Sequence, residues 1–176
     1  MIRLAMELGL HVNLYLDDAI YVDHATAELD AFALKDGVRQ QPVGDLAAFL
    51  ERPATKLLVI GPGPDLERLK ARFDAEPHEA AVIRSEPTFL EVLTPGVNKG
   101  TALTEVAALT GVPISAIAAF GDYDNDIEML RRAGLGVAVA NASDRLKAVA
   151  DLVCRGRQGT GVDEALWERV LGRDPQ

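Results

Sequence analysis

Cysteine and histidine are scarce in this chain of 176 residues, which contains one cysteine and three histidines. Cys154 cannot form a disulfide within the chain and cannot build a thiolate metal cluster, a usage typical of reducing compartments. The histidines at 11, 24 and 78 lack the spacing of metal ligands. We therefore expect a cytoplasmic protein that is not organised by disulfides or by a His/Cys metal site.

Basic charge is also in short supply, because 18 Lys and Arg residues stand against 27 Asp and Glu residues, for a net charge of −9. No basic stripe is available to replace the counterions of nucleic acid or of an anionic membrane surface. The sequence contains neither a continuous apolar run of membrane-spanning length nor the pattern of a signal peptide. We predict no nucleic-acid partner and no membrane association.

With 48% apolar and 26% charged residues, the composition is that of a globular protein with one sizeable core or two small domains. Thr94-Pro95-Gly96 opposes continuation of a helix or strand, so we place a domain boundary there. Residues 1–94 mix hairpins with helices, and Asp17-Asp18 falls in the turn of the first hairpin. In residues 95–176 short apolar strands alternate with helices, which predicts a parallel sheet covered on both faces.

Apolar periodicity and breaker residues place the individual elements. Before the boundary we predict strands over 11–16, 19–23, 56–60, 80–84 and 88–93, and helices over 2–8, 25–34, 43–50 and 65–73. After it we predict strands over 116–120, 135–140 and 152–154, and helices over 100–109, 124–132, 144–150 and 162–171.

The most informative segment is the acidic loop GDYDND (121–126), which follows a short apolar strand and whose glycine permits a sharp exit. Ligands of open α/β sheets bind outside the carboxyl ends of strands. Three crowded carboxylates repel one another, and a hard cation such as Mg²⁺ relieves that repulsion. Helix capping accounts for Asp124 alone. For Asp122, Asn125 and Asp126 together we favour a functional interpretation.

A second candidate element is Asn98-Lys99-Gly100, which opens a helix. The helix dipole opposes a lysine at this position unless an anion compensates for it. Phosphate is such an anion, and both the ammonium group and the exposed helix N–H groups could bind it. Taken alone, Lys99 is more simply a solvated surface lysine.

Together these segments resemble a known family. GVNKGTAL (96–103), AFGDYDNDIEML (119–130) and AGLGVAVANASDRLKAVADLV (133–153) resemble motifs three and four of the haloacid dehalogenase superfamily, in the branch of Cof-type phosphatases. The resemblance implies an α/β fold in which residues 95–176 form the C-terminal part of a Rossmann-like hydrolase core with a parallel sheet. Residues 1–94 would then be part of an α+β cap domain.

The resemblance also implies a cofactor, a substrate class and residue roles. The cofactor is Mg²⁺, and the substrate is a small phosphomonoester such as a sugar phosphate. Lys99 would bind the phosphoryl group, and Asn125 would contact it. Asp122 would be a direct metal ligand, and Asp126 would belong to the metal site by orienting Lys99 or a metal-bound water. Lys99, Asp122 and Asp126 are therefore the predicted catalytic residues.

One expected family feature has no counterpart in this sequence. Family members begin with an Asp-x-Asp segment on a central strand, whose first aspartate attacks phosphorus, whereas Asp17-Asp18 falls in a turn and Asp122-Tyr123-Asp124 belongs to motif four. We therefore expect an N-terminally truncated phosphatase that is nearly inactive as it stands. An oligomer or partner could cover the sheet edge that a missing strand would expose.

Two alternatives remain open. The chain could be a non-catalytic module that binds phosphate or Mg²⁺, or a subunit completed by another chain. A dinucleotide-binding domain is a weaker alternative, because GPGP (61–64) supplies only a fragment of the G-x-G-x-x-G pattern and contains a proline within it.

Overall fold

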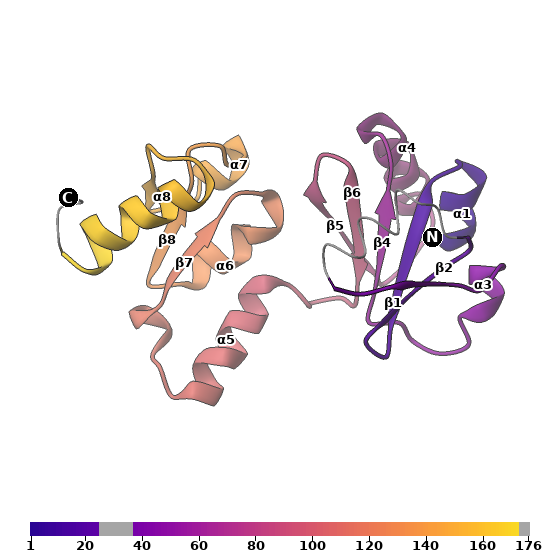
Figure 1. The fold of residues 1–176 in the computed structure, drawn as a ribbon, viewed down its shortest axis with the longest axis horizontal. Coiled ribbons are helices and arrows are strands. Elements are labelled where there is room, and N and C mark those ends of the chain that lie inside the picture. The colour runs from indigo at the N-terminus through magenta and orange to yellow at the C-terminus, as the bar shows by residue number, and fades with distance from the viewer. Residues whose placement is uncertain (25–36, 173–176) are drawn as a thin grey trace. The chain divides into compact units, whose positions relative to one another are not determined.

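The computed structural model describes residues 1–24 and 37–172, and the chain divides into two compact units, Met1–Pro95 and Gly96–Gln176 (Figure 1). The helix predicted over 25–34 lies outside the described residues. No helix in the described part is both long enough and apolar enough to cross a lipid bilayer. That the first unit serves as a cap and the second as part of a hydrolase core stays a prediction.

The first unit is built on a six-stranded sheet with the order β3-β2-β1-β4-β6-β5. Its strands are β1 (His11–Leu16), β2 (Ala19–Val22), β3 (Gln40–Pro42), β4 (Lys56–Ile60), β5 (Ala81–Glu86) and β6 (Phe89–Leu93). Neighbouring strands are antiparallel, except that β2 and β3 run parallel. Within residues 1–24 and 37–95, three helices accompany the sheet: α1 (Ile2–Glu7), α3 (Leu46–Phe49) and α4 (Gly63–Asp74).

Helices α1, α3 and α4 pack on one face of the sheet, where alternate strand residues form the core. Helix residues such as Leu46, Leu66 and Leu69 belong to the same buried cluster as Leu14 and Val59 of the central strands. Because side chains alternate between the faces of a strand, the pattern HVNLYL places Val12 and Leu14 in this core. Apolar burial of this kind supplies the dominant favourable free energy of folding.

The first hairpin confirms the prediction made from Asp17-Asp18. Leu16 pairs with Ala19, so the loop has two residues, and both aspartates have positive φ angles of 51° and 59°. Two left-handed residues define the turn that best matches the twist of adjacent strands, and aspartate tolerates that conformation better than most residues. Asp17 and Asp18 are therefore turn residues of this hairpin, and the Asp17 carboxylate forms an ion pair with Arg52.

β3 was not predicted, because Gln40-Gln41-Pro42 has no apolar alternation. The strand is short, lies at the sheet edge and buries the Gln40 side chain, whose Nε2 donates to Asn13 Oδ1 at 2.9 Å. His11 Nε2 lies 2.8 Å from the same oxygen, and burial lowers the pKa of the His11 imidazole. Polar contacts among His11, Asn13 and Gln40, rather than an apolar pattern, thus hold β3 at the edge of the sheet.

The second unit contains a parallel sheet with the order β7-β8-β9, which confirms the predicted alternation of strands and helices. Its strands are β7 (Ala118–Gly121), β8 (Leu135–Ala138) and β9 (Leu152–Val153). Its α-helices are α5 (Lys99–Thr110), α6 (Ile127–Arg132), α7 (Asp144–Lys147) and α8 (Gln158–Ala165). Short 3₁₀ turns cover Ile114–Ala116 and Asp124–Asp126, and a π-helical turn covers Leu166–Val170.

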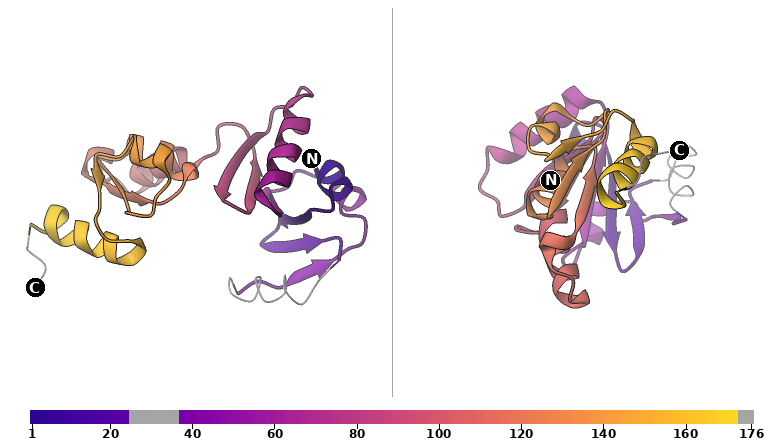
Figure 2. Two further views of the ribbon diagram at one scale, coloured as in Figure 1. Left: turned by 90° about the horizontal axis from the view of Figure 1, so that it is seen from above. Right: turned by 90° about the vertical axis from the view of Figure 1, so that its left-hand side faces the viewer.

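Both faces of this small sheet are covered, as Figures 1 and 2 show. Ala138 of β8 belongs to a cluster with Leu130 of α6 and Leu146 of α7. Its neighbour Val137 points to the other face and packs with Cys154 and with Ala165 of α8. The single cysteine is therefore a small buried hydrophobic residue in this core.

The start of α5 is fixed by a reciprocal cap. Asn98 Oδ1 accepts a hydrogen bond from Thr101 N at 2.9 Å, and Thr101 Oγ1 accepts one from Asn98 N at 3.0 Å. The second residue of the helix, Gly100, packs against the backbone of α6, so that a Cβ atom there would lie 2.4 Å from the Glu128 carbonyl oxygen. The cap and the close approach together set the position of Lys99, the first residue of α5.

We therefore expect Gly100→Ala to destabilise the second unit, by about 1–3 kcal/mol in free energy of unfolding, because the clash is with backbone that cannot move aside. Urea unfolding followed by the fluorescence of Trp167, the one tryptophan of the chain, would report on this unit. Gly159→Ala is the matched control, since a Cβ at Gly159 meets nothing within 4 Å. Equal midpoints for the two variants would contradict the packing described for α5 and α6.

Candidate active site

A cavity of about 360 Å³ opens in the second unit at the carboxyl end of β7. It is where the topology of a parallel sheet places a ligand. Polar side chains line part of it: Lys99, Asp122, Asp126 and Gln158. The remaining lining comes from Gly121 and from the apolar side chains of Phe120, Met129, Val139 and Val162.

Asp126 is the buried centre of this site, with a relative exposure of 2%. Its Oδ1 accepts a hydrogen bond from Lys99 Nζ at 2.5 Å. Its Oδ2 accepts from the backbone N–H groups of Asp122, at 3.0 Å, and of Tyr123, at 3.3 Å. A buried carboxylate is tolerated when it is paired and hydrogen-bonded, and here each oxygen has a protein donor.

Gly121 makes room for that carboxylate. A Cβ atom at Gly121 would lie 2.6 Å from Asp126 Cβ and 2.8 Å from Asp126 Oδ2. Gly121 does not have a positive φ angle. The sharp exit from the strand that we expected therefore does not explain why a glycine is present here. The reason is steric, because the folded-back side chain of Asp126 occupies the space that any other residue would need.

Lys99 reaches the cavity from the first turn of α5. Its side chain keeps a relative exposure of 51% although its ammonium group is bound to Asp126. The helix dipole disfavours a cation at this end of a helix, and the Asp126 carboxylate supplies the compensating negative charge. An ammonium group has three N–H donors, so the bond to Asp126 leaves donors for a ligand.

Asp122 is exposed, and its carboxylate has no hydrogen bond or ion pair within residues 1–24 and 37–172. Its backbone is nevertheless fixed on both sides, since its N–H donates to Asp126 Oδ2 and its carbonyl oxygen accepts from Ser143 N at 2.9 Å. The structure therefore brings Lys99, Asp122 and Asp126 together around one cavity. Asn125 is half-buried and does not line it, so the phosphate contact predicted for Asn125 stays a prediction.

The Asp124 carboxylate is bound by two other side chains. It accepts hydrogen bonds from Ser143 Oγ at 2.6 Å and from Arg145 Nη1 at 2.7 Å, which tie the acidic loop to the start of α7. The crowding of carboxylates that suggested a cation is thus largely relieved by protein groups, with Lys99 serving Asp126 and Arg145 serving Asp124. Of the three carboxylates in this loop, only that of Asp122 has no protein group to balance its charge within the described residues.

Magnesium fits Asp122 better than it fits Asp126. Mg²⁺ is commonly held by one or two carboxylates together with substrate phosphate and water, and Asp122, which lines the cavity, offers a carboxylate as a hard oxygen donor. Both oxygens of Asp126 are already engaged with Lys99 and the loop backbone. Within the described residues no group of three or more His, Cys, Asp or Glu side chains is arranged to hold a metal ion.

Gln158, which was not predicted as a site residue, lines the same cavity. Its φ angle is 49°, a left-handed value that is uncommon outside glycine, and its N–H donates to Asn141 Oδ1 at 2.9 Å. No local sequence pattern marks a glutamine that adopts this conformation. Only the fold reveals that Gln158 and Lys99 line the same cavity.

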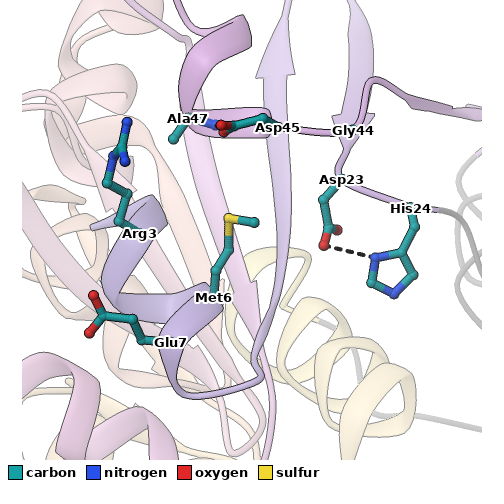
Figure 3. A pocket seen from close by; sticks show the side chains of 8 residues that line it. All are labelled: Arg3, Met6, Glu7, Asp23, His24, Gly44, Asp45 and Ala47. Carbon is teal, nitrogen blue, oxygen red and sulfur yellow. Dashed lines mark hydrogen bonds and ion pairs between the residues drawn. The ribbon is translucent and has the colours of Figure 1, made fainter.

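The first unit has a cavity of its own, of about 550 Å³, shown in Figure 3. It is lined by Arg3, Met6, Glu7, Asp23, His24, Gly44, Asp45 and Ala47. Asp23 and His24 form a hydrogen bond of 2.8 Å along its rim, and the His24 side chain is 72% exposed. This is an open surface hollow of mixed charge, without the buried, fully bonded carboxylate that organises the site in the second unit.

Replacing Asp126 by asparagine tests that carboxylate. The amide has one oxygen, so it cannot accept from Lys99 and from the two backbone N–H groups together, and we expect the second unit to lose about 1–3 kcal/mol of stability. The matched control is Asp124→Asn, which weakens an ion pair whose Arg145 side chain is 78% exposed and should cost less than about 1 kcal/mol. Urea unfolding would measure the stability of both variants. An equal loss of stability would contradict the conclusion that the Asp126 carboxylate holds the site together.

Residues 1–166 match a family described as haloacid dehalogenase-like hydrolase. A phosphoglycolate phosphatase of Methanoculleus marisnigri is 41% identical over 137 residues, which are 65% of this chain and 58% of that protein. A 5-amino-6-(5-phospho-D-ribitylamino)uracil phosphatase of Bacillus subtilis is 31% identical over 156 residues, which are 87% of this chain and 57% of that protein.

Solved structures agree with this assignment. A haloacid dehalogenase-like hydrolase from Bacteroides thetaiotaomicron superposes with a TM-score of 0.72 at 26% identity, covering 96% of this chain and 64% of that one. A Thermotoga maritima protein superposes with a TM-score of 0.70 at 30% identity, covering 94% of this chain and 62% of that one. The chain thus spans somewhat more than half the length of its relatives, and by its sequence and its fold it belongs to the haloacid dehalogenase-like hydrolases.

Proposed function

We propose that this chain supplies the phosphate-binding and magnesium-binding part of a phosphatase site that acts on small phosphomonoesters. The observation that carries the proposal is the convergence of the Lys99 ammonium and the Asp122 carboxylate on one cavity, with Asp126 bonded to both segments. Relatives named as phosphatases support the reaction class.

The phosphoryl group would bind at the start of α5. Asn98 caps Thr101 N, and the N–H groups that precede it in the helix have no acceptor within the helix. These N–H groups, the helix dipole and the Lys99 ammonium all favour an anion at this place. Because Asp126 holds the ammonium, Lys99 would be oriented before the ligand arrives, and that lowers the entropy cost of binding.

Asp122 would hold a magnesium ion beside the bound phosphoryl group. When bound there, the ion would supply the positive charge that stabilises a transferring phosphoryl group, since catalysis of this reaction depends mainly on positioning and electrostatics. The role of Asp122 would be to hold the ion. The role of Asp126 would be to position Lys99 and the loop, which refines its predicted place in the metal site.

The described residues offer this cavity no carboxylate that is free to attack phosphorus. Asp122 would be needed for the metal, Asp126 is locked by three donors, and Asp124 is bound to Ser143 and Arg145. Asp17 and Asp18 form the hairpin turn of the first unit. We therefore expect the 176-residue chain alone to bind a phosphate ester with little hydrolysis.

One observation favours a second candidate, a subunit completed by another chain. β7 is an edge strand in the sheet of the second unit. Leu135 N and Val139 N bond to the carbonyl oxygens of Ile117 and Gly121, so the alternate residues Ala118 and Phe120 direct their backbone groups away from β8. Such an edge can pair with a further strand, and a strand that ends in a carboxylate would deliver the missing nucleophile beside Lys99.

Titration calorimetry with inorganic phosphate, in the presence and absence of Mg²⁺, tests the proposal. We expect Mg²⁺ to tighten phosphate binding in the natural chain and in Asp124→Asn, the matched control. Asp122→Asn should abolish the magnesium effect, and Lys99→Ala should weaken phosphate binding by about tenfold or more, because a charge-assisted hydrogen bond is lost. Binding that is indifferent to both Lys99 and Asp122 would refute the assignment.

Hydrolysis of 4-nitrophenyl phosphate by the purified chain separates the two candidates. Negligible turnover that rises when a strand-donating partner is added would favour the completed subunit. Strong turnover by the chain alone, lost in Asp122→Ala, would show instead that a nucleophile is present that we have not identified.

A further inference from the structure

We propose that Ser143 is a positioning residue for the metal site, because it holds the backbone of Asp122, whose carboxylate would bind Mg²⁺. The inference rests on the proposed function, since it assumes that Asp122 holds the ion. It goes beyond that function by assigning a role in magnesium binding to a residue that does not itself line the cavity.

Ser143 belongs to the loop that follows β8, the strand next to β7 in the parallel sheet. The carboxyl ends of neighbouring parallel strands lie at the same edge of a sheet, so this loop adjoins the acidic loop that follows β7. The preceding residue, Ala142, is buried in one cluster with Leu130 and Leu146. The core therefore anchors the segment from which Ser143 reaches the acidic loop.

Ser143 contacts the acidic loop at two points. Its backbone N–H donates to the carbonyl oxygen of Asp122 at 2.9 Å. Its hydroxyl group donates to Asp124 Oδ1 at 2.6 Å, two positions further along the loop. Because the hydroxyl is the donor, this second bond requires an acceptor oxygen at position 124 and not a negative charge. Two bonds from one residue fix the direction of the chain between Asp122 and Asp124 as well as its position.

The Ser143 hydroxyl is itself held in place by a third bond. Leu146 N donates to Ser143 Oγ at 3.2 Å, and Ser143 is thereby the N-cap of α7. The side chain of Leu146 is fully buried, which ties α7 to the core of the second unit. The hydroxyl therefore connects the acidic loop to a helix whose own position is fixed.

Ser143 and Asp126 both hold the backbone of Asp122, but they connect it to different groups. Asp126 accepts from the N–H of Asp122 and also from the ammonium group of Lys99, so it serves the metal ligand and the phosphate ligand together. Ser143 bonds to the carbonyl oxygen of Asp122 and, within the described residues, has no bond to Lys99. Loss of the Ser143 contacts should therefore weaken magnesium binding and spare phosphate binding.

A site with one free carboxylate depends strongly on such positioning. Within the described residues no group of three or more His, Cys, Asp or Glu side chains is arranged to hold a metal ion. If the backbone of Asp122 could move, it would have to be ordered when the ion binds, and that entropy cost would weaken binding. Residues that orient metal ligands influence metal affinity for this reason.

Calorimetry on the full chain tests this role through two quantities. One is the affinity for inorganic phosphate without Mg²⁺, and the other is the magnesium effect, defined as the factor by which Mg²⁺ tightens that affinity. Ser143→Ala removes the hydroxyl, so we expect the magnesium effect to fall about three- to tenfold, a range typical of residues that act on a site without touching its ligand. The affinity for phosphate without Mg²⁺ should change by less than about twofold, because the bond between Lys99 and Asp126 is retained.

Two further substitutions at the same position separate the hydroxyl contact from the start of α7. Ser143→Gly removes the hydroxyl but leaves a residue that is well tolerated at an N-cap, so it should fold and show the same loss of the magnesium effect as Ser143→Ala. Ser143→Thr keeps a hydroxyl that can donate to Asp124 and cap α7, so it should restore most of the magnesium effect.

Asp151→Ala is the control for a loss of stability in the second unit. Asp151 Oδ2 accepts from the N–H of Gly136, the second residue of β8, at 2.8 Å, whereas the acidic loop lies at the carboxyl end of the sheet. This substitution should lower the urea midpoint of the second unit and leave the magnesium effect unchanged.

The outcomes distinguish this inference from the proposed function. If Asp122→Asn abolishes the magnesium effect while Ser143→Ala and Ser143→Gly retain it, the role of Ser143 is wrong and the proposed function stands. If the Ser143 variants weaken phosphate binding without Mg²⁺ as much as they weaken the magnesium effect, or if Asp151→Ala reduces the magnesium effect equally, the role of Ser143 is structural and the inference is overturned. If Mg²⁺ does not tighten phosphate binding in the natural chain, the magnesium part of the proposed function fails and the inference fails with it.

Discussion

The buried carboxylate of Asp126 is the interaction on which the rest of the site depends. One of its oxygens holds the ammonium of Lys99, and the other holds the backbone of the acidic loop through the N–H groups of Asp122 and Tyr123. Two segments separated by 27 positions are thereby joined at the end of β7. Gly121 is required for the same reason, because the carboxylate lies where its side chain would be.

This arrangement changes the physical explanation of the acidic loop. Its carboxylates have different partners: Lys99 balances Asp126, and Arg145 with Ser143 balances Asp124. Protein groups therefore hold the loop in shape, and a divalent ion is not required for that. What remains open toward the cavity is the Asp122 carboxylate, on a backbone that is fixed from both sides. Such a preorganised, exposed acid suits the binding of an ion together with its ligand.

Local patterns predicted much of the fold. The alternation HVNLYL and the turn at Asp17-Asp18 identified the first hairpin, and the short apolar strands after residue 95 identified the parallel sheet. β3 was missed because its residues are polar and its place depends on the contact between Gln40 and Asn13. The last helix begins at Gln158, earlier than the predicted 162, because Asn141 fixes its start from another segment.

The candidate site was predictable in part for the same reason. The position of GDYDND after an apolar strand predicted Asp122, Asn125 and Asp126, of which Asp122 and Asp126 line the cavity, since the position of a loop at a strand end is a local property. The partner of Asp124 was not predictable, because Arg145 lies 21 positions away and on a different helix. Gln158 was likewise hidden, since its conformation and its cavity both arise from tertiary contacts.

A crystal structure of the chain grown with magnesium and phosphate would test the central claim most directly. We predict a phosphate ion within hydrogen-bonding distance of Lys99 Nζ, a magnesium ion between that phosphate and the Asp122 carboxylate, and an unbroken bond between Lys99 and Asp126. A phosphate ion bound elsewhere, with Lys99 released from Asp126 and Asp122 directed away from it, would contradict the account.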